Sequence, residues 1–459
     1  MTSASHRFLV VTLIAAGLLG WPGLPARGQS SRAAFDPRRT PAVEVFQRYK
    51  DSVICVTGPA VYGRGQLKLV EEFFQGARNR EVTSLGSGFV VHESGYILTN
   101  VHTVEKVIAH SVTLRDGRTY PADLLALERR QDLALLKIDA GRPLPAVKFA
   151  RGGDLMIGEP VIVIGNPFGL PSTCTTGVLS AVGRATRPNG LPGVTLHDML
   201  QTDAAINAGS SGGPWFNALG QVIGITAVKR MNSENISFGV PVAAIRFCLP
   251  DMLDVEHRYG IATGLVLRPS EPAQVVAVAA GSPAALAGVQ PGDLIERLNG
   301  EPIAGRLEFS LALIGRKPQD TLRLDLLRDG KPEQVMLALG AQPKPDGAAL
   351  LKTFYGLTAV PLDAAKAQAA ALRVRRGVVI TDVAQGPPWN YDKLQAPPLP
   401  GDVLARINSI RPHDLGDVGL VLERIQPGQA VNMVLLRRSG ELMTRVDLMV
   451  VAPRRAGRP

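Results

Sequence analysis

The chain has 459 residues, of which 45% are apolar and 20% are charged, and its formal net charge is +10 at pH 7. This composition is ordinary for globular protein, and the length gives room for two to four domains. Lysine and arginine are dispersed, without a sustained basic run that includes aromatic residues. The sequence therefore argues against a nucleic-acid partner and predicts a solvated basic surface.

The N-terminus has the pattern of an export signal. Arg7 precedes the apolar run of residues 8–19, and Ala26-Arg27-Gly28 provides a small-x-small cleavage site. The run is too short for a comfortable membrane span, and no later segment reaches about 18 consecutive apolar residues. We predict a signal peptide over residues 1–28 and an exported protein of the periplasm or cell envelope, tethered to the membrane if the signal is retained.

Three cysteines, Cys55, Cys174 and Cys248, have neither C-x-x-C spacing nor the Cys/His spacing of a metal site. We interpret them as buried structural thiols, with a single disulfide of undetermined pairing as the alternative after export. The sequence predicts no metal site and no cofactor.

Residues 43–49 predict a short helix and residues 52–57 the first strand. The next stretch, residues 58–82, lacks clear alternation and is typical of a long loop. Because long loops in compact domains are usually functional or disordered, we predict a regulatory or substrate-facing role for it.

Residues 89–91 and 96–99 predict two strands around the turn Glu93-Ser94-Gly95. His102 lies where the second strand ends. A lone histidine is more often a satisfied structural residue than a base, but aspartate and serine candidates further along the chain make this one a candidate base. The other histidines lack a comparable setting.

Asp132 directly precedes the apolar strand of residues 133–138, whose first residues are expected to be partly buried. A carboxylate there is costly unless it accepts hydrogen bonds, and an imidazole Nδ1–H is a suitable donor. We therefore predict that Asp132 orients His102, against the alternative of an aspartate that caps a strand end. Asp116, by contrast, belongs to an Asp-Gly hairpin turn.

The segment QTDAAINAGSSGGP, residues 201–214, carries the candidate nucleophile Ser211. A serine hydroxyl is a weak nucleophile at neutral pH, so a hydrolase pairs it with a base and surrounds it with backbone that approaches a substrate carbonyl. Glycines on both sides allow that approach, and we expect the amides of Gly209 and Ser211 to form an oxyanion hole. On this motif alone, a polar turn between two strands is an equally good interpretation.

Residues 209–213 also match the G-x-S-x-G nucleophile elbow, which requires a helix after the serine and places the aspartate and histidine later in the chain. Here residues 215–228 predict a hairpin that ends in a β-branched strand. The candidate histidine and aspartate lie upstream, and the order His, Asp, Ser is that of the chymotrypsin-type double barrel. Residues 160–164 and 177–182 predict strands of the second barrel, and residues 243–253 predict a closing helix.

Four motifs together resemble the HtrA (DegP-like) family of exported trypsin-like serine proteases. In family order over most of residues 43–250, they are TNVHTV (99–104), DLALLKI (132–138), GNPFG (165–169) and the segment 201–214. The resemblance implies a double β-barrel with His102 as general base and acid, Asp132 orienting it, and Ser211 attacking the carbonyl. It also implies a homotrimer or a larger homo-oligomer.

The chain departs from the family at two positions, with Ser210 in place of asparagine and Val101 in place of asparagine or alanine. Ser210 also argues against activation of the digestive-enzyme type, in which an aspartate before the nucleophile binds a new N-terminus. In trypsin-like folds the residue six positions before the nucleophile forms the base of the S1 pocket, and here it is Ala205. A P1 cation would lack a partner there, so we predict small or medium aliphatic P1 residues and a structural role for Asp203.

An internal repeat occupies the C-terminal half. Residues 289–300 (VQPGDLIERLNG) are matched by residues 399–409 (LPGDVLARINS), at a spacing of 109 positions. The repeat predicts two domains of about 90 to 100 residues, joined by a Pro-rich linker near residues 340–347. Their expected helices cover residues 307–315 and 417–424.

The repeat resembles PDZ domains, and tandem PDZ modules after the protease fit the same family. A PDZ groove binds an extended peptide by strand addition and captures its terminal carboxylate. The carboxylate-loop positions are matched by Tyr259, Gly260 and Ile261 in the first copy and by Tyr355, Gly356 and Leu357 in the second. The second copy also has Gly386-Pro387-Pro388-Trp389 and a Pro-rich insertion, so a rigid spacer is an equal alternative for it.

The predicted fold is mainly β, with a chymotrypsin-like double β-barrel followed by two PDZ domains, each a small α+β barrel. The predicted boundaries are a protease at 29–255, PDZ domains at 257–340 and 353–452, a linker at 341–352 and a basic tail at 453–459. The predicted function is that of an ATP-independent serine endopeptidase that degrades misfolded or damaged proteins, with PDZ domains that recruit unfolded chains or peptide C-termini or regulate activity. The alternative is a non-catalytic chaperone or scaffold that binds unfolded chains.

Overall fold

The computed structural model describes residues 36–59, 83–105, 110–166, 172–187, 194–207, 209–229, 235–362, 377–384, 396–408, 410–426, 428–439 and 442–451. The chain divides into an N-terminal unit, residues 1–39, and a second unit, residues 40–459, to which the helices and strands belong. The predicted signal peptide, nearly all of the predicted loop at 58–82 and the basic tail lie outside the described residues. Within the described ranges, no helix is both long and apolar enough to cross a membrane.

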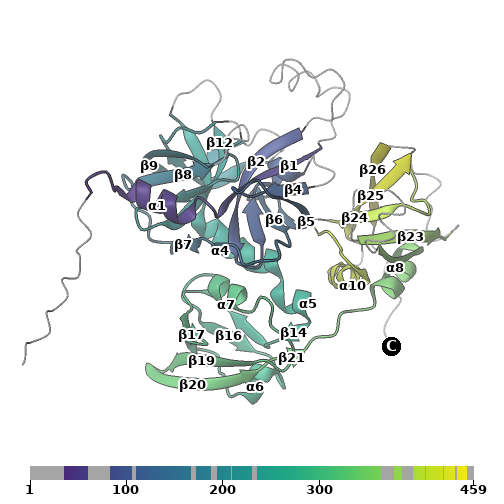
Figure 1. Ribbon diagram of the computed structural model, residues 1–459. Coiled ribbons are helices and arrows are strands. Elements are labelled where there is room, and N and C mark those ends of the chain that lie inside the picture. Colours follow the sequence, from purple (N-terminus) through teal and green to yellow (C-terminus); the bar gives the residue numbers. More distant parts are fainter. Residues whose placement is uncertain are drawn as a thin grey trace, which may run out of the picture. The chain divides into compact units, whose positions relative to one another are not determined.

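Six strands close the first barrel in the order β1-β2-β3-β6-β5-β4 (Figure 1). Strands β3 and β6 are buried on both faces, apart from half-buried Lys137 at the end of β6, which explains their continuous apolar runs. Strand β3 ends three residues before His102, and β6 begins directly after Asp132. Both members of the candidate dyad therefore lie next to buried core strands. The elements are α1 (Pro41–Tyr49), β1 (Val53–Pro59), β2 (Thr83–His92), β3 (Tyr96–Thr99), β4 (His110–Thr113), β5 (Thr119–Glu128) and β6 (Leu133–Lys137).

The second barrel is a ring of six strands in the order β11-β8-β9-β10-β13-β12, closed by the pairing of β11 with β12, and β7 extends it in parallel beside β12 (Figure 1). Trp215 is fully buried in it, and its indole N–H donates to Thr226 Oγ1 at 2.8 Å. The segment with Ser211 connects β10 to β11. The elements are β7 (Lys148–Phe149), β8 (Pro160–Gly165), β9 (Thr173–Thr186), β10 (Leu196–Thr202), β11 (Pro214–Phe216), β12 (Gln221–Lys229), β13 (Ser237–Pro241) and α4 (Val242–Leu253).

Short strands and three helices, α5, α6 and α7, follow the barrels in the described part of the chain. A four-stranded sheet, β18-β17-β19-β20, is accompanied by the pairs β14–β21 and β15–β16. Leu307 and Phe309 on α7 are buried against this sheet's apolar face, as the predicted helix at 307–315 requires. The elements are α5 (Val255–Tyr259), β14 (Ile261–Ala262), β15 (Leu265–Leu267), β16 (Val275–Val278), α6 (Pro283–Leu286), β17 (Leu294–Leu298), β18 (Glu301–Pro302), α7 (Arg306–Ala312), β19 (Thr321–Arg328), β20 (Lys331–Ala338) and β21 (Gly340–Ala341).

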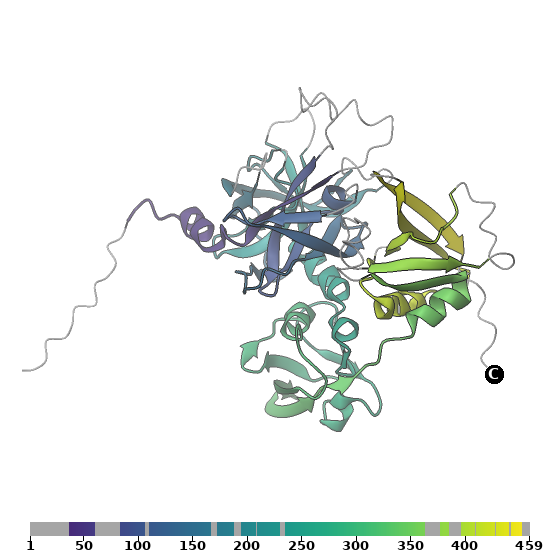
Figure 2. The same ribbon diagram turned by 45° about the vertical axis from the view of Figure 1, so that its right-hand side comes forward.

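The last part of the chain is a five-stranded antiparallel sheet, β22-β23-β24-β25-β26, with its own apolar core. Helices α8 and α10 lie side by side against it (Figures 1 and 2). The elements are α8 (Gly347–Tyr355), β22 (Leu357–Leu362), β23 (Gly377–Val383), β24 (Val403–Ile407), α10 (Leu415–Arg424), β25 (Ala430–Ser439) and β26 (Leu442–Val451). The segment predicted as a linker, 341–352, therefore includes Ala341 of β21 and the first part of α8.

Each copy of the sequence repeat contains an ion pair between a buried aspartate and an arginine, at equivalent positions. Asp293 accepts two hydrogen bonds from Arg328, at 2.8 and 2.7 Å, and Asp402 accepts two from Arg437 at the same distances. Both carboxylates are only 1% exposed. A buried carboxylate requires such partners, so the Gly-Asp of the repeated motif fixes the start of β17 and of β24.

We expect Asp293→Asn to weaken β17 and β19 locally by about 2 kcal/mol, because the amide loses one of the two acceptors for Arg328 and leaves that guanidinium with Glu333 as its counter-charge. Burial acts to raise the pKa of Asp293, but hydrogen bonds from Arg328 and from the Gln290 amide hold that pKa below its ordinary value. The contribution is therefore complete above the unfolded-state pKa of about 3.9 and is lost as pH falls through the lower folded-state value. Amide hydrogen exchange of β17 and β19 in the full chain measures the effect, and the exposed turn variant Asp329→Asn, which should leave exchange unchanged, is the control.

The prediction that all three cysteines are buried is wrong for Cys174, which is exposed, and Cys55 is half-buried, whereas Cys248 is buried. Side chains alternate between the two faces along the first half of β9, and Cys174 lies on the solvent face of that strand. All three cysteines are free thiols.

Candidate active site

His102 and Asp132 form a hydrogen-bonded pair. The distance from His102 Nδ1 to Asp132 Oδ2 is 2.6 Å, and the His102 backbone amide donates to Asp132 Oδ1 at 3.1 Å. The Asp132 side chain is fully buried and that of His102 is 15% exposed. One carboxylate thus holds both the backbone and the imidazole ring of His102.

His102 lies on the one-turn helix α3 (Val101–Val104), rather than at a strand end. The Asn100 side chain donates to the Asp132 carbonyl at 2.9 Å, and the Val101 amide donates to the same oxygen at 3.3 Å. Asp132 has a left-handed backbone conformation, φ 55°, which aspartate tolerates better than most residues. Backbone contacts therefore join the histidine and aspartate segments independently of the side-chain pair.

The support continues at the other end of α3. Glu105 closes this helix through its amide, which donates to the Val101 carbonyl at 2.8 Å, and its carboxylate accepts hydrogen bonds from Arg129 at 2.7 and 2.9 Å. Arg129 lies three residues before Asp132. The sequence reasoning missed both Glu105 and Asn100, because neither residue has a local signal beyond its polarity next to the histidine.

The loop with Ser211 is held by a dense set of backbone hydrogen bonds. Within it, Gly213 N–H donates to the Ser210 carbonyl and Ser210 N–H to the Asn207 carbonyl, at 2.9 and 3.0 Å. Strand β12 contributes two more, because Gly212 N–H donates to the Thr226 carbonyl and Thr226 N–H to the Gly213 carbonyl. Gly209 and Gly212 have φ of 91° and 83°, so side-chain-bearing residues would be strained at both positions.

Two backbone donors of this loop have no partner among the described residues. Among the described residues, no acceptor is hydrogen-bonded to the N–H of Gly209 or to that of Ser211. These are the two amides that the sequence predicted as oxyanion donors. Buried or half-buried N–H groups are almost always paired, so two neighbouring unpaired donors beside a serine are typical of a site that binds an oxygen of a ligand.

Ser87 joins the nucleophile loop to the first barrel. Its N–H donates to the Ser211 carbonyl at 2.7 Å, and Thr99 Oγ1 donates to the Ser87 carbonyl at 2.7 Å. Thr99 is the last residue of β3, three positions before His102. The serine and histidine segments, 109 positions apart in sequence, therefore meet at one buried residue of β2.

The sequence reasoning did not single out Ser87. The available signal was a serine between two glycines, Gly86 and Gly88, directly before the apolar run of residues 89–91. Glycine in a strand often marks a close approach by another segment of backbone.

The residues predicted for the S1 pocket lie just before this loop. Ala205 is exposed, and its carbonyl accepts from Thr175 Oγ1 at 2.9 Å. Asp203 Oδ1 accepts from the Val178 amide at 2.7 Å, so this carboxylate links the β10 end to β9. That bond agrees with the predicted structural role of Asp203.

The predicted carboxylate-loop residues occupy matching positions in the two repeats. Gly260 ends α5 with φ 65°, and Gly356 ends α8 with φ 61°; each glycine caps its helix with its own N–H. The Tyr259 hydroxyl lies 3.0 Å from the Tyr96 hydroxyl, with which it shares a hydrogen bond, whereas Tyr355 is buried. The structure thus places a helix C-terminus and then a strand, β14 or β22, at both sites, but the two tyrosines differ in environment. The strand residues that follow the glycines are Ile261 and Leu357.

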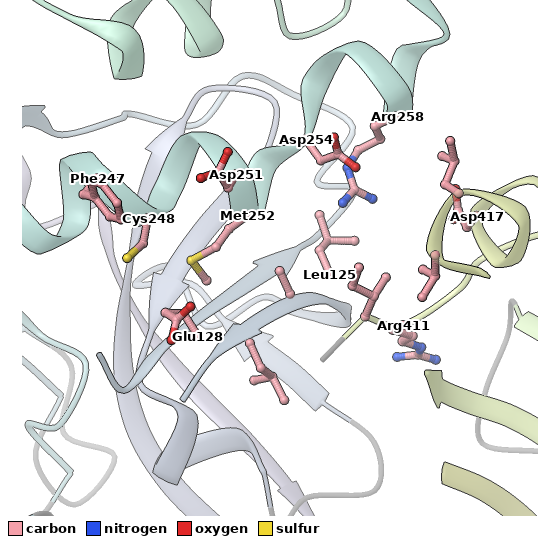
Figure 3. A pocket seen from close by; sticks show the side chains of 15 residues that line it. Leu125, Glu128, Phe247, Cys248, Asp251, Met252, Asp254, Arg258, Arg411 and Asp417 are labelled. Carbon is pink, nitrogen blue, oxygen red and sulfur yellow. The ribbon is translucent and has the colours of Figure 1, made fainter. Parts of the chain in front are cut away.

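The residues that line a pocket of about 250 Å³, shown in Figure 3, do not include the triad candidates. It is lined by Leu125 and Glu128 of β5, by Cys248 of α4 and by residues near α10, among them Arg411 and Asp417. Burial, together with nearby Glu128 and Asp251, raises the pKa of the Cys248 thiol to about 11. The thiol is protonated at neutral pH, which agrees with its interpretation as a structural residue.

His110 also differs from His102. Its side chain is buried, and burial lowers the pKa of the imidazole to about 4. Its Nε2 is 3.0 Å from the Val104 carbonyl. We interpret His110 as a structural residue of the barrel, because its neutral imidazole is buried and hydrogen-bonded to a backbone carbonyl.

Comparisons with known proteins identify the family of the chain. The family model of a trypsin-like peptidase domain matches residues 86–225, and that of a PDZ domain matches residues 223–339. The chain is 32% identical over 390 residues to a protein of Pseudomonas putida named as a probable periplasmic serine endoprotease, DegP-like. The alignment covers 79% of each of the two chains. A protein of the same name from Pseudomonas fluorescens is 32% identical over 406 residues, covering 81% of this chain and 82% of its own.

Among solved structures, the serine endoprotease of Yersinia pestis is 28% identical and is matched over 66% of this chain and 98% of its own, with a TM-score of 0.37. An HtrA-type protease, AlgW, solved with a decapeptide, has 28% identity, the same coverage of this chain, 99% coverage of its own and a TM-score of 0.38. The residues matched by the peptidase model lie in the two barrels, and a single PDZ domain is matched by a family model. The chain is a serine protease and belongs to the HtrA (DegP-like) family of trypsin-like serine endoproteases.

Proposed function

We propose that Ser211 is the nucleophile of this protease, that His102 is its general base and acid, and that Asp132 orients His102. The observation that carries the proposal is the combination of the His102–Asp132 pair with two amides beside Ser211 that have no acceptor among the described residues. The N–H groups of Gly209 and Ser211 then form the oxyanion hole. Hydrogen-bond donors fixed in advance stabilise a developing oxyanion without reorganisation during the reaction.

The reaction is an acyl transfer in two stages. Ser211 Oγ attacks the scissile carbonyl carbon while His102 Nε2 takes the hydroxyl proton, and the carbonyl oxygen becomes an oxyanion that accepts from the two amides. His102 then gives the proton to the leaving amine, and the C–N bond breaks to leave an acyl-enzyme. Water, deprotonated by His102, attacks the ester and returns Ser211 to its free form.

We propose misfolded or damaged polypeptides as the substrates, in the periplasm, because the relatives are named as periplasmic serine endoproteases. The PDZ domain recruits unfolded chains or peptide C-termini, or regulates activity. The purified full-length protein should digest unfolded casein without ATP and leave compact folded proteins intact. If casein stays intact in every oligomeric state while its aggregation is suppressed, the chaperone alternative holds instead.

The second copy of the repeat is proposed as a second PDZ domain. Equivalent buried Asp–Arg pairs and equivalent helix-ending glycines support this assignment. Its residues 385–395, which include the first part of the Pro-rich insertion, lie outside the described residues, and a rigid spacer is the alternative role for this copy. A homotrimer or larger homo-oligomer is proposed from the family resemblance alone.

We expect Ala205→Asp to raise kcat/KM for P1 arginine, relative to P1 valine, roughly 10- to 100-fold, because the new carboxylate provides the counter-charge that the wild-type pocket lacks. Cleavage of a peptide library by both proteins measures the ratio. Asp203→Asn is the matched control, since Asp203 binds the Val178 amide, and it should keep the aliphatic preference. A strong preference of the wild type for P1 arginine would overturn the assignment of Ala205.

A further inference from the structure

The nucleophile loop lacks the charged anchor of digestive proteases, because the residue before Ser211 is the neutral, buried Ser210. A different group must hold the loop against the tendency of its glycines to change conformation. Ser87 is fully buried under the loop and contacts it twice. Its N–H donates to the Ser211 carbonyl and its Oγ donates to the Gly209 carbonyl, each at 2.7 Å.

We infer that Ser87 is a positioning residue that holds the oxyanion loop in its catalytic conformation through the Gly209 carbonyl; the inference rests on the proposed roles of Gly209 and Ser211. The direction of the hydroxyl hydrogen bond follows from its second partner. The Asn166 amide, which is only a donor, lies 2.8 Å from Ser87 Oγ. The single hydroxyl proton is therefore left for the Gly209 carbonyl.

Carbonyl contacts determine where the oxyanion donors point, because each peptide group is planar and its C=O and N–H are opposed. The Ser210 carbonyl accepts from the Gly213 amide, which directs the Ser211 N–H the other way. The Gly209 carbonyl shares its peptide group with the Ser210 N–H, so the Ser87 hydroxyl and the Asn207 carbonyl hold that peptide group from both sides. This also fixes the position of the Gly209 Cα, where φ is 91°. Without the Ser87 bond, a shift of this Cα would move the attached Gly209 N–H away from the oxyanion site.

Close packing leaves little room for another group to replace the hydroxyl. A Cβ added to Gly212 would lie 2.1 Å from the Ser87 carbonyl oxygen, and one added to Gly165 would lie 3.4 Å from Ser87 Oγ. The two glycines thus allow the loop and the end of β8 to approach Ser87. The Gly209 carbonyl and the Asn166 amide would both lose a partner if the hydroxyl were removed.

The test is Ser87→Ala in the full-length protein, with kcat and KM for a peptide substrate and the affinity for a peptide boronate, whose hydroxyl occupies the oxyanion site. Loss of one oxyanion donor lowers kcat by about 10²- to 10³-fold, so a donor that is displaced only part of the time should lower kcat about 10- to 100-fold. KM should stay within about twofold, and boronate affinity should fall with kcat. The matched control is Ser52→Ala, which removes a fully buried hydroxyl without a hydrogen-bond partner among the described residues and should leave kcat unchanged.

An unchanged kcat in Ser87→Ala would overturn the inference, and so would a loss that lies entirely in KM or leaves boronate affinity intact. If Ser87→Ala does not fold, Ser87→Cys replaces it, because the thiol keeps the size and a weak donor; a lower kcat at unchanged KM supports the inference, and a wild-type kcat overturns it. Labelling by a fluorophosphonate separates the two proposals. An active wild type that labels at Ser211, with a fully active Ser87→Ala, contradicts the role of Ser87 alone, whereas labelling elsewhere contradicts the proposed triad.

Discussion

Replacement of Ser211 by alanine is expected to lower kcat for unfolded casein about a million-fold, because it removes the nucleophile while water attack keeps only the oxyanion hole and substrate binding. The fold should be retained, since the loop bonds at this residue use its carbonyl, which accepts from the Ser87 amide. Initial rates of casein digestion by the purified full-length proteins measure the loss. Fluorophosphonate labelling should disappear in parallel.

The neighbouring serine provides the matched control. Ser210→Ala keeps the backbone bonds of Ser210 to Asn207 and Gly213 and should retain activity within about tenfold. Equal activity of Ser211→Ala and the wild type would contradict the assignment of the nucleophile. Equal inertness of both in every oligomeric state, combined with suppression of aggregation, would instead favour the chaperone alternative.

Asp132→Asn is expected to lower kcat at neutral pH about 10⁴-fold with little change in KM. The carboxylate accepts from both the His102 backbone amide and its Nδ1, whereas an amide side chain offers one acceptor and one donor. An NH₂ group facing Nδ1 stabilises the tautomer with the proton on Nε2, which is unable to accept the serine proton. Steady-state kinetics on a peptide substrate measure the effect.

Asp116→Asn is the control for this variant, because Asp116 lies in the hairpin turn, accepts from the Arg118 amide and pairs with exposed Arg142. It should leave kcat within about twofold. A comparable loss of activity in both variants would indicate a general effect of removing a carboxylate from this barrel, and a fully active Asp132→Asn would remove Asp132 from the triad.

The sequence identified the triad candidates because strongly patterned strands surround them. Residues 96–98 and 133–136 are continuous apolar runs, so the strands could be located from the sequence, and the polar residues beside them stood out. The G-D motif of the repeat was visible for a similar reason, since a buried carboxylate needs the same partner in each copy. Local pattern and chain order were sufficient for these features.

The tertiary structure alone decided how the site is held. Ser87 donates to Gly209 across 122 positions of sequence, and the exposure of Cys174 depends on the face of β9 that the second barrel leaves open. Local periodicity predicts neither the Ser87–Gly209 hydrogen bond nor the exposure of Cys174. Both depend on how the barrels close and not on the neighbouring residues in the sequence. The amino-acid sequence by itself determined the order His102, Asp132, Ser211 and the two-barrel architecture, whereas only the folded chain brought Ser87 of the first barrel against the Gly209 and Ser211 carbonyls of the loop.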